Sequence, residues 1–117
     1  MAYKFKELQI WKRSRLFCSQ IYVITSKFSD SEKFGLTNQL RRASVSIPSN
    51  KAEGFSRNSN KDFARFLHIS IGSAYEIETQ LLISADLNFI FDNELQSCFS
   101  ELGKIIKMIS KFKSTLN

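Results

Sequence analysis

The chain has 117 residues, a net charge of +6 and a sequence pI of about 9.5. This length fits one domain over residues 1–117 and can bury a core without metal ions or cross-links. With 43% hydrophobic residues but only 4 Gly and 1 Pro, the composition favours a few long helices and argues against a fold of many short strands.

The N-terminal residues and the cysteines indicate a cytoplasmic protein. Residues 1–6 contain neither an apolar stretch nor the cleavage site of a secretory signal, and the longest apolar run is far too short for a membrane span. Cys18 and Cys98 have no C-x-x-C spacing. We therefore expect two reduced thiols and no membrane association.

The first predicted helix runs from about residue 7 to residue 28. Its inner face consists of apolar and small side chains at helical spacing, namely Ile10, Trp11, Phe17, Cys18, Ile21, Ile24, Thr25 and Phe28. The sequence Ser29-Asp30-Ser31-Glu32 then carries an S-x-x-E capping signal.

A second helix is predicted from about residue 34 to residue 55. Its inner stripe is narrow and consists of Leu36, Leu40, Ala43, Ile47 and Gly54. Pro48 lies inside this segment, and a proline removes one backbone donor and clashes with the carbonyl four residues earlier. We expect a kink at Pro48 because the stripe resumes in phase after it.

The third and fourth helices are predicted to start after short polar connectors. Ser59 or Asn58 would cap the third, which runs to about Leu87, and Asp92 or Asn93 opens the fourth. The third helix buries Phe63, Phe66, Leu67, Ser70, Ala74, Ile77, Leu81 and Ala85. The fourth has a seam with steps of four and three, made by Leu95, Cys98, Leu102, Ile105, Ile109, Phe112 and Leu116. The sequence therefore predicts an all-α, up-down-up-down four-helix bundle, with a two-hairpin helical array as the alternative.

More apolar residues are present than one bundle needs. Leu16 and Val23 lie off the main face of the first helix, and Ile71, Tyr75 and Leu82 form a second stripe on the third. Scattered exposed apolar residues are normal in monomers. A second apolar arc is more often buried against another copy of the chain, so these five residues are predicted to form an oligomer interface.

No catalytic constellation is visible. His68 is the single histidine, so a di-metal site with two Glu-x-x-His pairs is excluded, and Glu76 and Glu78 are two residues apart and point to different sides of a helix. A glycine-rich phosphate loop is also absent from the sequence. We expect a protein that is not an enzyme and needs no metal or cofactor.

Polar residues follow one side of the second helix. They are predicted to form a network with acidic side chains of the third helix, and its members are Gln39, Arg42, Asn50, Glu53, Glu76 and Glu78. This network would set the register of the helices. A ligand groove is the alternative interpretation of the same stripe.

The basic residues point to an acidic partner. Arg57, Lys61 and Arg65 recur every four residues near a helix N-terminus, where phosphate binds well. The predicted nucleic-acid-binding residues are Arg41, Arg57, Lys61, Arg65, Lys104, Lys107 and Lys111. No base-reading motif is recognisable in the sequence, so binding without sequence specificity is expected.

Several sequence runs together resemble one known family over nearly the whole chain. They are ELQIWK at 7–12, IY at 21–22, FGLTNQLRRASVSIPSN at 34–50, AEG at 52–54, Arg57, FARFL at 63–67 and GSAYEIETQL at 72–81. These runs are similar to the four-helix bundle family of the 23S rRNA intervening-sequence protein. Lys51 departs from the pattern, because the family usually has an apolar residue there.

The resemblance implies a left-handed bundle that assembles as a ring-like homopentamer, and it implies no enzymatic activity. A similar fold occurs in the accessory protein of diversity-generating retroelements, which engages a reverse transcriptase and nucleic acid. Two functional hypotheses follow. The first is a homo-oligomeric protein that binds nucleic acid, RNA in particular. The second is a scaffold that binds an acidic protein partner such as a reverse transcriptase.

Overall fold

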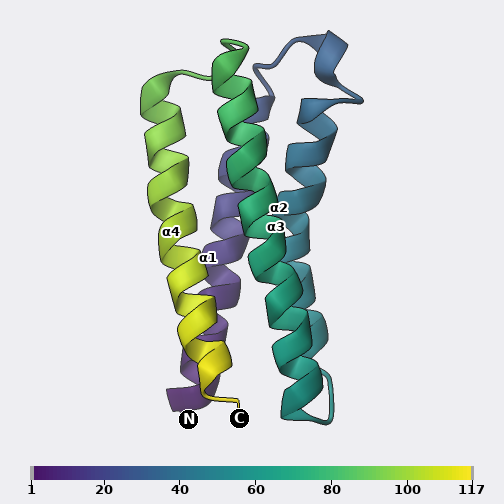
Figure 1. Cartoon of the computed structure of the whole chain (residues 1–117), viewed down its shortest axis with the longest axis vertical. Helices are drawn as coiled ribbons and strands as arrows, with labels where there is room; N and C mark the ends of the chain where they lie inside the picture. The colour runs from purple at the N-terminus through teal and green to yellow at the C-terminus, as the bar shows by residue number, and fades with distance from the viewer. Residues whose placement is uncertain (1, 117) are drawn as a thin grey trace.

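The computed structural model describes the backbone of residues 2–116 and the side chains of residues 7–116. It consists of four long antiparallel helices, which are α1 (Ala2–Thr25), α2 (Leu36–Phe55), α3 (Asn60–Asp86) and α4 (Asp92–Ser114), with a short 3₁₀ helix η1 (Asp30–Glu32) between α1 and α2 (Figure 1). No strand occurs in these described residues. The predicted all-α four-helix bundle is therefore confirmed.

Each helix packs against the next one in the chain, and α1 closes the bundle against α4. Consequently α1 and α3 lie diagonally opposite each other. The molecule measures 43 × 25 × 18 Å. Both termini and the α2–α3 connection (56–59) lie at one end, here called the terminal end, and the other two connections lie at the far end (Figure 1).

The predicted inner faces make the core. Every residue of the predicted seam on α4 is at most 7% exposed, and Leu40, Ile47, Leu67 and Ile77 are completely buried. The aromatic ring of Phe63 packs edge-on against Phe112 near the terminal end. Periodicity alone identified these positions because a helix that buries one stripe leaves little choice about which side chains point inward.

The helix termini agree with the predicted caps at α3 and differ before α2. Ser59 accepts a hydrogen bond from the N–H of Asp62, as predicted for the N-cap of α3. Ser29 instead begins η1, and α2 starts two residues later than expected, after an exposed Phe34. Glu32 then accepts a hydrogen bond from the N–H of Leu36. The acidic residue of the S-x-x-E signal therefore caps α2, while its serine caps η1.

Helix α2 continues through Pro48 without restarting. The hydroxyl of Ser70 on α3 donates to the carbonyl of Ile47, directly before the proline, at 2.9 Å. This contact ties α2 to α3 at the position where the proline weakens the helix. The kink at Pro48 and the left-handed twist of the bundle stay predictions.

Candidate functional site

Basic side chains are concentrated in the half of the molecule next to the terminal end. This half comprises residues 7–13, 46–73 and 104–116, and it holds ten of the fifteen Lys and Arg side chains that the structure describes but only three of the eleven acidic ones. Its formal charge is +7, whereas the far half carries −3. The antiparallel packing produces this separation, because it brings segments from all four helices to each end (Figure 1).

Six of the seven residues predicted to bind nucleic acid lie in this basic half. Three of them, Arg57, Lys61 and Arg65, surround the α2–α3 connection, and Lys104, Lys107 and Lys111 are exposed along the second half of α4. Arg41 lies in the far half instead. Its guanidinium stacks 4.5 Å from the ring of Tyr22 and donates to Thr25 Oγ1 at 2.9 Å. The structure therefore does not bring Arg41 together with the others.

The two arginines of the α2–α3 corner share one aromatic ring. The guanidinium carbons of Arg57 and Arg65 each lie 4.6 Å from the centroid of Phe66. Arg57 also pairs with Glu53 at 3.2 Å, and Arg65 with Asp62 at 3.7 Å. All four of these charged side chains are more than 40% exposed, so the ion pairs are weak and a phosphate group can compete for the guanidinium groups.

Four of the five predicted interface residues are on the surface. Leu16 and Val23 on α1 are each 67% exposed, and Tyr75 and Leu82 on α3 are 53% and 46% exposed. Ile71 differs, because it is partly buried and packs against the core. Since α1 and α3 are diagonal neighbours, these residues make two separate apolar surfaces on opposite sides of the bundle, here called the α1 surface (Leu16, Val23) and the α3 surface (Tyr75, Leu82).

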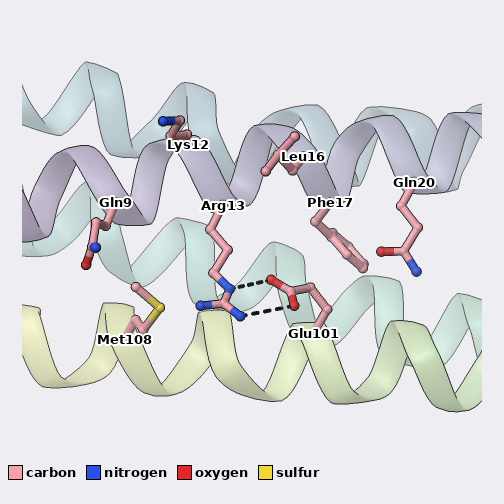
Figure 2. A pocket seen from close by; sticks show the side chains of 8 residues that line it. All are labelled: Gln9, Lys12, Arg13, Leu16, Phe17, Gln20, Glu101 and Met108. Atoms are coloured by element: carbon pink, nitrogen blue, oxygen red, sulfur yellow. Dashed lines mark hydrogen bonds and ion pairs between the residues drawn. The ribbon is translucent and has the colours of Figure 1, made fainter.

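A groove of about 450 Å³ between α1 and α4 runs beside Leu16. Arg13 from α1 and Glu101 from α4 meet across it, with Nε 2.6 Å from Oε2 (Figure 2). The remaining wall is contributed mostly by α1. The two charged groups compensate each other and link α1 to α4 across the groove.

The polar stripe of α2 forms two small clusters with α3. In the first, Ser46 and Ser73 share a hydrogen bond of 2.8 Å, and Asn50 donates to Ser46 Oγ at the same distance. In the second, the buried amide of Gln80 donates to Gln39 and Glu76 at 3.4 and 3.3 Å. The Ser46–Ser73 and Gln80–Gln39 bonds join α2 to α3, whereas the other two bonds lie within one helix.

Three predicted network members make no hydrogen bond within these clusters. Arg42 lines an open groove of about 340 Å³ together with cluster residues of both helices. Glu53 pairs with Arg57 on the surface, and Glu78 is half-buried on α3. Sequence reasoning missed Gln80, which is the centre of the second cluster. The signal was its place four residues after the predicted member Glu76, on the same face of α3.

The sequence also did not predict a buried ion pair that the structure contains. Glu7 and Lys51 have side chains only 2% and 8% exposed, and Oε1 of Glu7 lies 3.1 Å from Nζ of Lys51. Lys51 is the residue where the resemblance predicts an apolar side chain. At this depth α1 supplies a carboxylate that compensates the charge of the lysine.

Within residues 7–116, no three His, Cys, Asp or Glu side chains come close enough to hold a metal ion. His68 is exposed, and Cys18 and Cys98 are free. Burial, with a smaller effect of the Glu94 charge, raises the pKa of the Cys98 thiol to about 11, so it is an unreactive thiol at neutral pH. None of the described helices combines the length and apolar character of a membrane span.

Comparisons with known proteins agree with this architecture. A solved structure of a protein with unknown function, from the S23 ribosomal protein family of Bacteroides thetaiotaomicron, superposes with a TM-score of 0.85. It is 22% identical and covers 93% of this chain and 98% of its own, which shows a shared fold. No curated protein matches the chain. The model of the 23S rRNA-intervening sequence protein family matches residues 6–111, and the chain therefore belongs to this family.

Proposed function

We propose that this protein is a non-catalytic homo-oligomer that binds nucleic acid, RNA in particular, through its basic terminal end. Phosphate contacts supply the affinity, and such contacts carry no sequence information. The observation that carries the proposal is the charge of +7 in the terminal half of a molecule whose other half is acidic. A field of this shape attracts a polyanion and orients it toward one end.

The arrangement of the basic groups supports phosphate binding. Lys61 lies in the first turn of α3, where the backbone N–H groups of the helix N-terminus also favour an anion. Lys107 and Lys111 are exposed one turn apart near the end of α4. The name of the family refers to an rRNA insert, which is in keeping with RNA as the ligand.

The two apolar surfaces support self-association in a ring. A two-fold dimer uses one self-complementary surface, whereas a ring needs two different surfaces that meet head to tail. The α1 surface and the α3 surface lie on different faces of the bundle, so one copy can offer its α1 surface to the α3 surface of the next. The family resemblance makes five the proposed number of subunits. A ring would place the basic ends of its subunits around one axis and add their fields.

The test is a salt titration with a fluorescently labelled single-stranded RNA. Binding, followed by fluorescence anisotropy, is expected to weaken steeply as the salt concentration rises, because bound phosphates release counterions. Replacing Lys61 and Lys111 by alanine should reduce the slope of log K against log salt by about one for each lysine.

The matched control is Lys33→Ala, which removes an exposed lysine from the far end and should leave both the affinity and the slope unchanged. Equal losses in the two variants would mean that binding is not located at the terminal end. Absence of binding at low salt would end the nucleic-acid proposal and leave the protein scaffold as the function to test.

A further inference from the structure

The open groove of about 340 Å³ between α2 and α3 has a polar lining, and its volume lies at the lower end of the range of small-molecule sites. Three small side chains that are buried or half-buried form its floor, namely Ala43, Ser46 and Ser73. Four polar side chains that are exposed form its rim, namely Asn38, Gln39, Arg42 and Glu76. The groove therefore presents accessible polar groups above a floor of small side chains.

The two charged groups of the rim are not used by the protein. Arg42 comes from α2 and Glu76 from α3, so they belong to opposite walls, and no ion pair joins them. Among the described side chains, Arg42 has no hydrogen-bond or ion-pair partner, and Glu76 accepts one hydrogen bond, from Gln80 to Oε2 at 3.3 Å. The guanidinium of Arg42 and Oε1 of Glu76 are thus available to a ligand.

Polar groups behind the lining hold the walls in place. The Gln80 side chain does not line the groove, is only 5% exposed, and donates both to Gln39 on α2 and to Glu76 on α3. Asn50 holds Ser46 at the floor in a similar way, at 2.8 Å. Because these contacts exist without a ligand, binding would need little additional ordering of the walls.

The charges of the rim restrict the ligand. A phosphate or another simple anion would be attracted by Arg42 but repelled by Glu76, and a simple cation would meet the opposite conflict. A small zwitterion satisfies both groups. Its carboxylate can form paired hydrogen bonds with the planar guanidinium, and its ammonium can donate to the carboxylate of Glu76. A free amino acid carries these two groups on one carbon atom.

We propose that this groove binds a free α-amino acid. Arg42 binds its carboxylate, Glu76 binds its ammonium, and its side chain faces the floor. Because the floor is made of small side chains with two hydroxyl groups, a short polar side chain fits better than a large apolar one. The proposal is independent of nucleic-acid binding, since most of the lining belongs to the far half of the molecule, whose formal charge is −3.

The test is a titration of the full chain, labelled with ¹⁵N, with L-serine, followed by two-dimensional NMR. A dissociation constant on the order of 1 mM is expected, because the ligand is small and both of its charged contacts are open to solvent. The saturable shifts should include the side-chain amides of Asn38 and Gln39. L-Leucine, N-acetyl-L-serine and L-serinamide should each bind at least about tenfold more weakly, since each loses one of the three proposed contacts.

Neighbouring residues provide matched control variants. Arg42→Gln and Glu76→Gln each remove one exposed charge of the rim and should weaken serine binding at least about tenfold. Arg41→Gln and Glu78→Gln remove the same charges from positions that do not line the groove, so both should keep the affinity within about twofold. Circular dichroism verifies that all four variants are folded.

The outcomes distinguish this site from the proposed function. If neither serine nor any of the other nineteen amino acids gives saturable shifts up to 20 mM, the amino-acid site is overturned. Shifts that persist in both Arg42→Gln and Glu76→Gln would place the binding elsewhere and would also overturn it. The RNA affinity of these two variants should equal that of the unmodified protein, so either proposal can fail while the other holds.

Discussion

At the scale of single residues, the Glu7–Lys51 pair has the largest expected influence on stability. Both side chains are almost completely buried, and each compensates the charge of the other. Removing one partner leaves the other as an isolated buried charge, whereas removing both leaves an apolar contact. Single and double variants should therefore differ strongly.

We expect Glu7→Gln to lower the free energy of unfolding by about 3–5 kcal/mol, because Lys51 then stays buried without a counter-charge. The double variant Glu7→Leu with Lys51→Leu should lie within about 1 kcal/mol of the unmodified protein or above it. Urea denaturation measures both values. A single variant as stable as the double one would show that the pair is hydrated in solution.

The buried thiol of Cys98 makes stability depend on alkaline pH. Burial raises its pKa from 9.0 to about 11, so the unfolded chain loses this proton at lower pH than the folded chain does. The contribution of the Cys98 thiol to the free energy of unfolding is present in full below pH 9. It falls by about 2 kcal/mol as the pH rises toward 11. Denaturation at pH 8, 9 and 10 should show a fall that Cys98→Ala lacks, and identical pH profiles would contradict it.

At the scale of helices, replacing glycine by alanine is expected to have opposite effects on stability at two positions. A Cβ at Gly54 would lie 2.8 Å from both Phe63 Cδ1 and Phe66 Cβ, where α2 passes close to α3. A Cβ at Gly103 on α4 would meet nothing within 4 Å. The first glycine permits close helix packing, and the second only weakens its own helix.

Gly54→Ala is expected to destabilise the bundle by about 1–3 kcal/mol through overpacking, despite the higher helix propensity of alanine. Gly103→Ala should stabilise it by about 1 kcal/mol, since only propensity changes. Thermal unfolding of the two variants tests this difference. Equal shifts in the same direction would mean that α2 and α3 are not as close as the structure places them.

At the scale of the whole molecule, the two apolar surfaces predict how copies associate. If the α1 surface of one copy meets the α3 surface of the next, damage to either surface should break every contact in the ring. A variant with Leu16→Glu and Val23→Glu, and another with Tyr75→Glu and Leu82→Glu, should each be monomeric. Sedimentation velocity measures this.

Mixing these two variants provides the decisive comparison. Each retains the surface that the other has lost, so a head-to-tail interface should give a one-to-one heterodimer and nothing larger. A two-fold interface would leave one of the variants dimeric on its own. A monomeric unmodified protein at micromolar concentration would remove the proposed ring.

The helices and the core were predictable from the sequence, because helical periodicity is a local property. The seam of α4 repeats over the length of the helix, and Leu95, Leu102 and Ile109 are buried as its spacing requires. The Ser59 cap is equally local. The start of α2 was harder to predict, because Ser29 caps η1 whereas Glu32 accepts a hydrogen bond from the first residue of α2.

The candidate site was predictable only in part. Lysines and arginines could be counted from the sequence, but their gathering at one end depends on how four antiparallel helices align. Arg41 is an example. The sequence grouped it with the other predicted nucleic-acid-binding residues, but in the structure it lies in the far half, where it contacts Tyr22 and Thr25. Glu7 lies three residues before Ile10, on the inner face of α1, and this position indicates a buried charge. The sequence does not identify which residue pairs with it.

The sequence by itself determined the helices, the faces that they bury and the positive net charge, because each of these follows from composition or from neighbours within two helical turns. Only the tertiary structure decided that Glu7 meets Lys51 and that the charge is divided between two ends. These features join residues far apart in the chain, and their contacts depend on the packing of one helix against another.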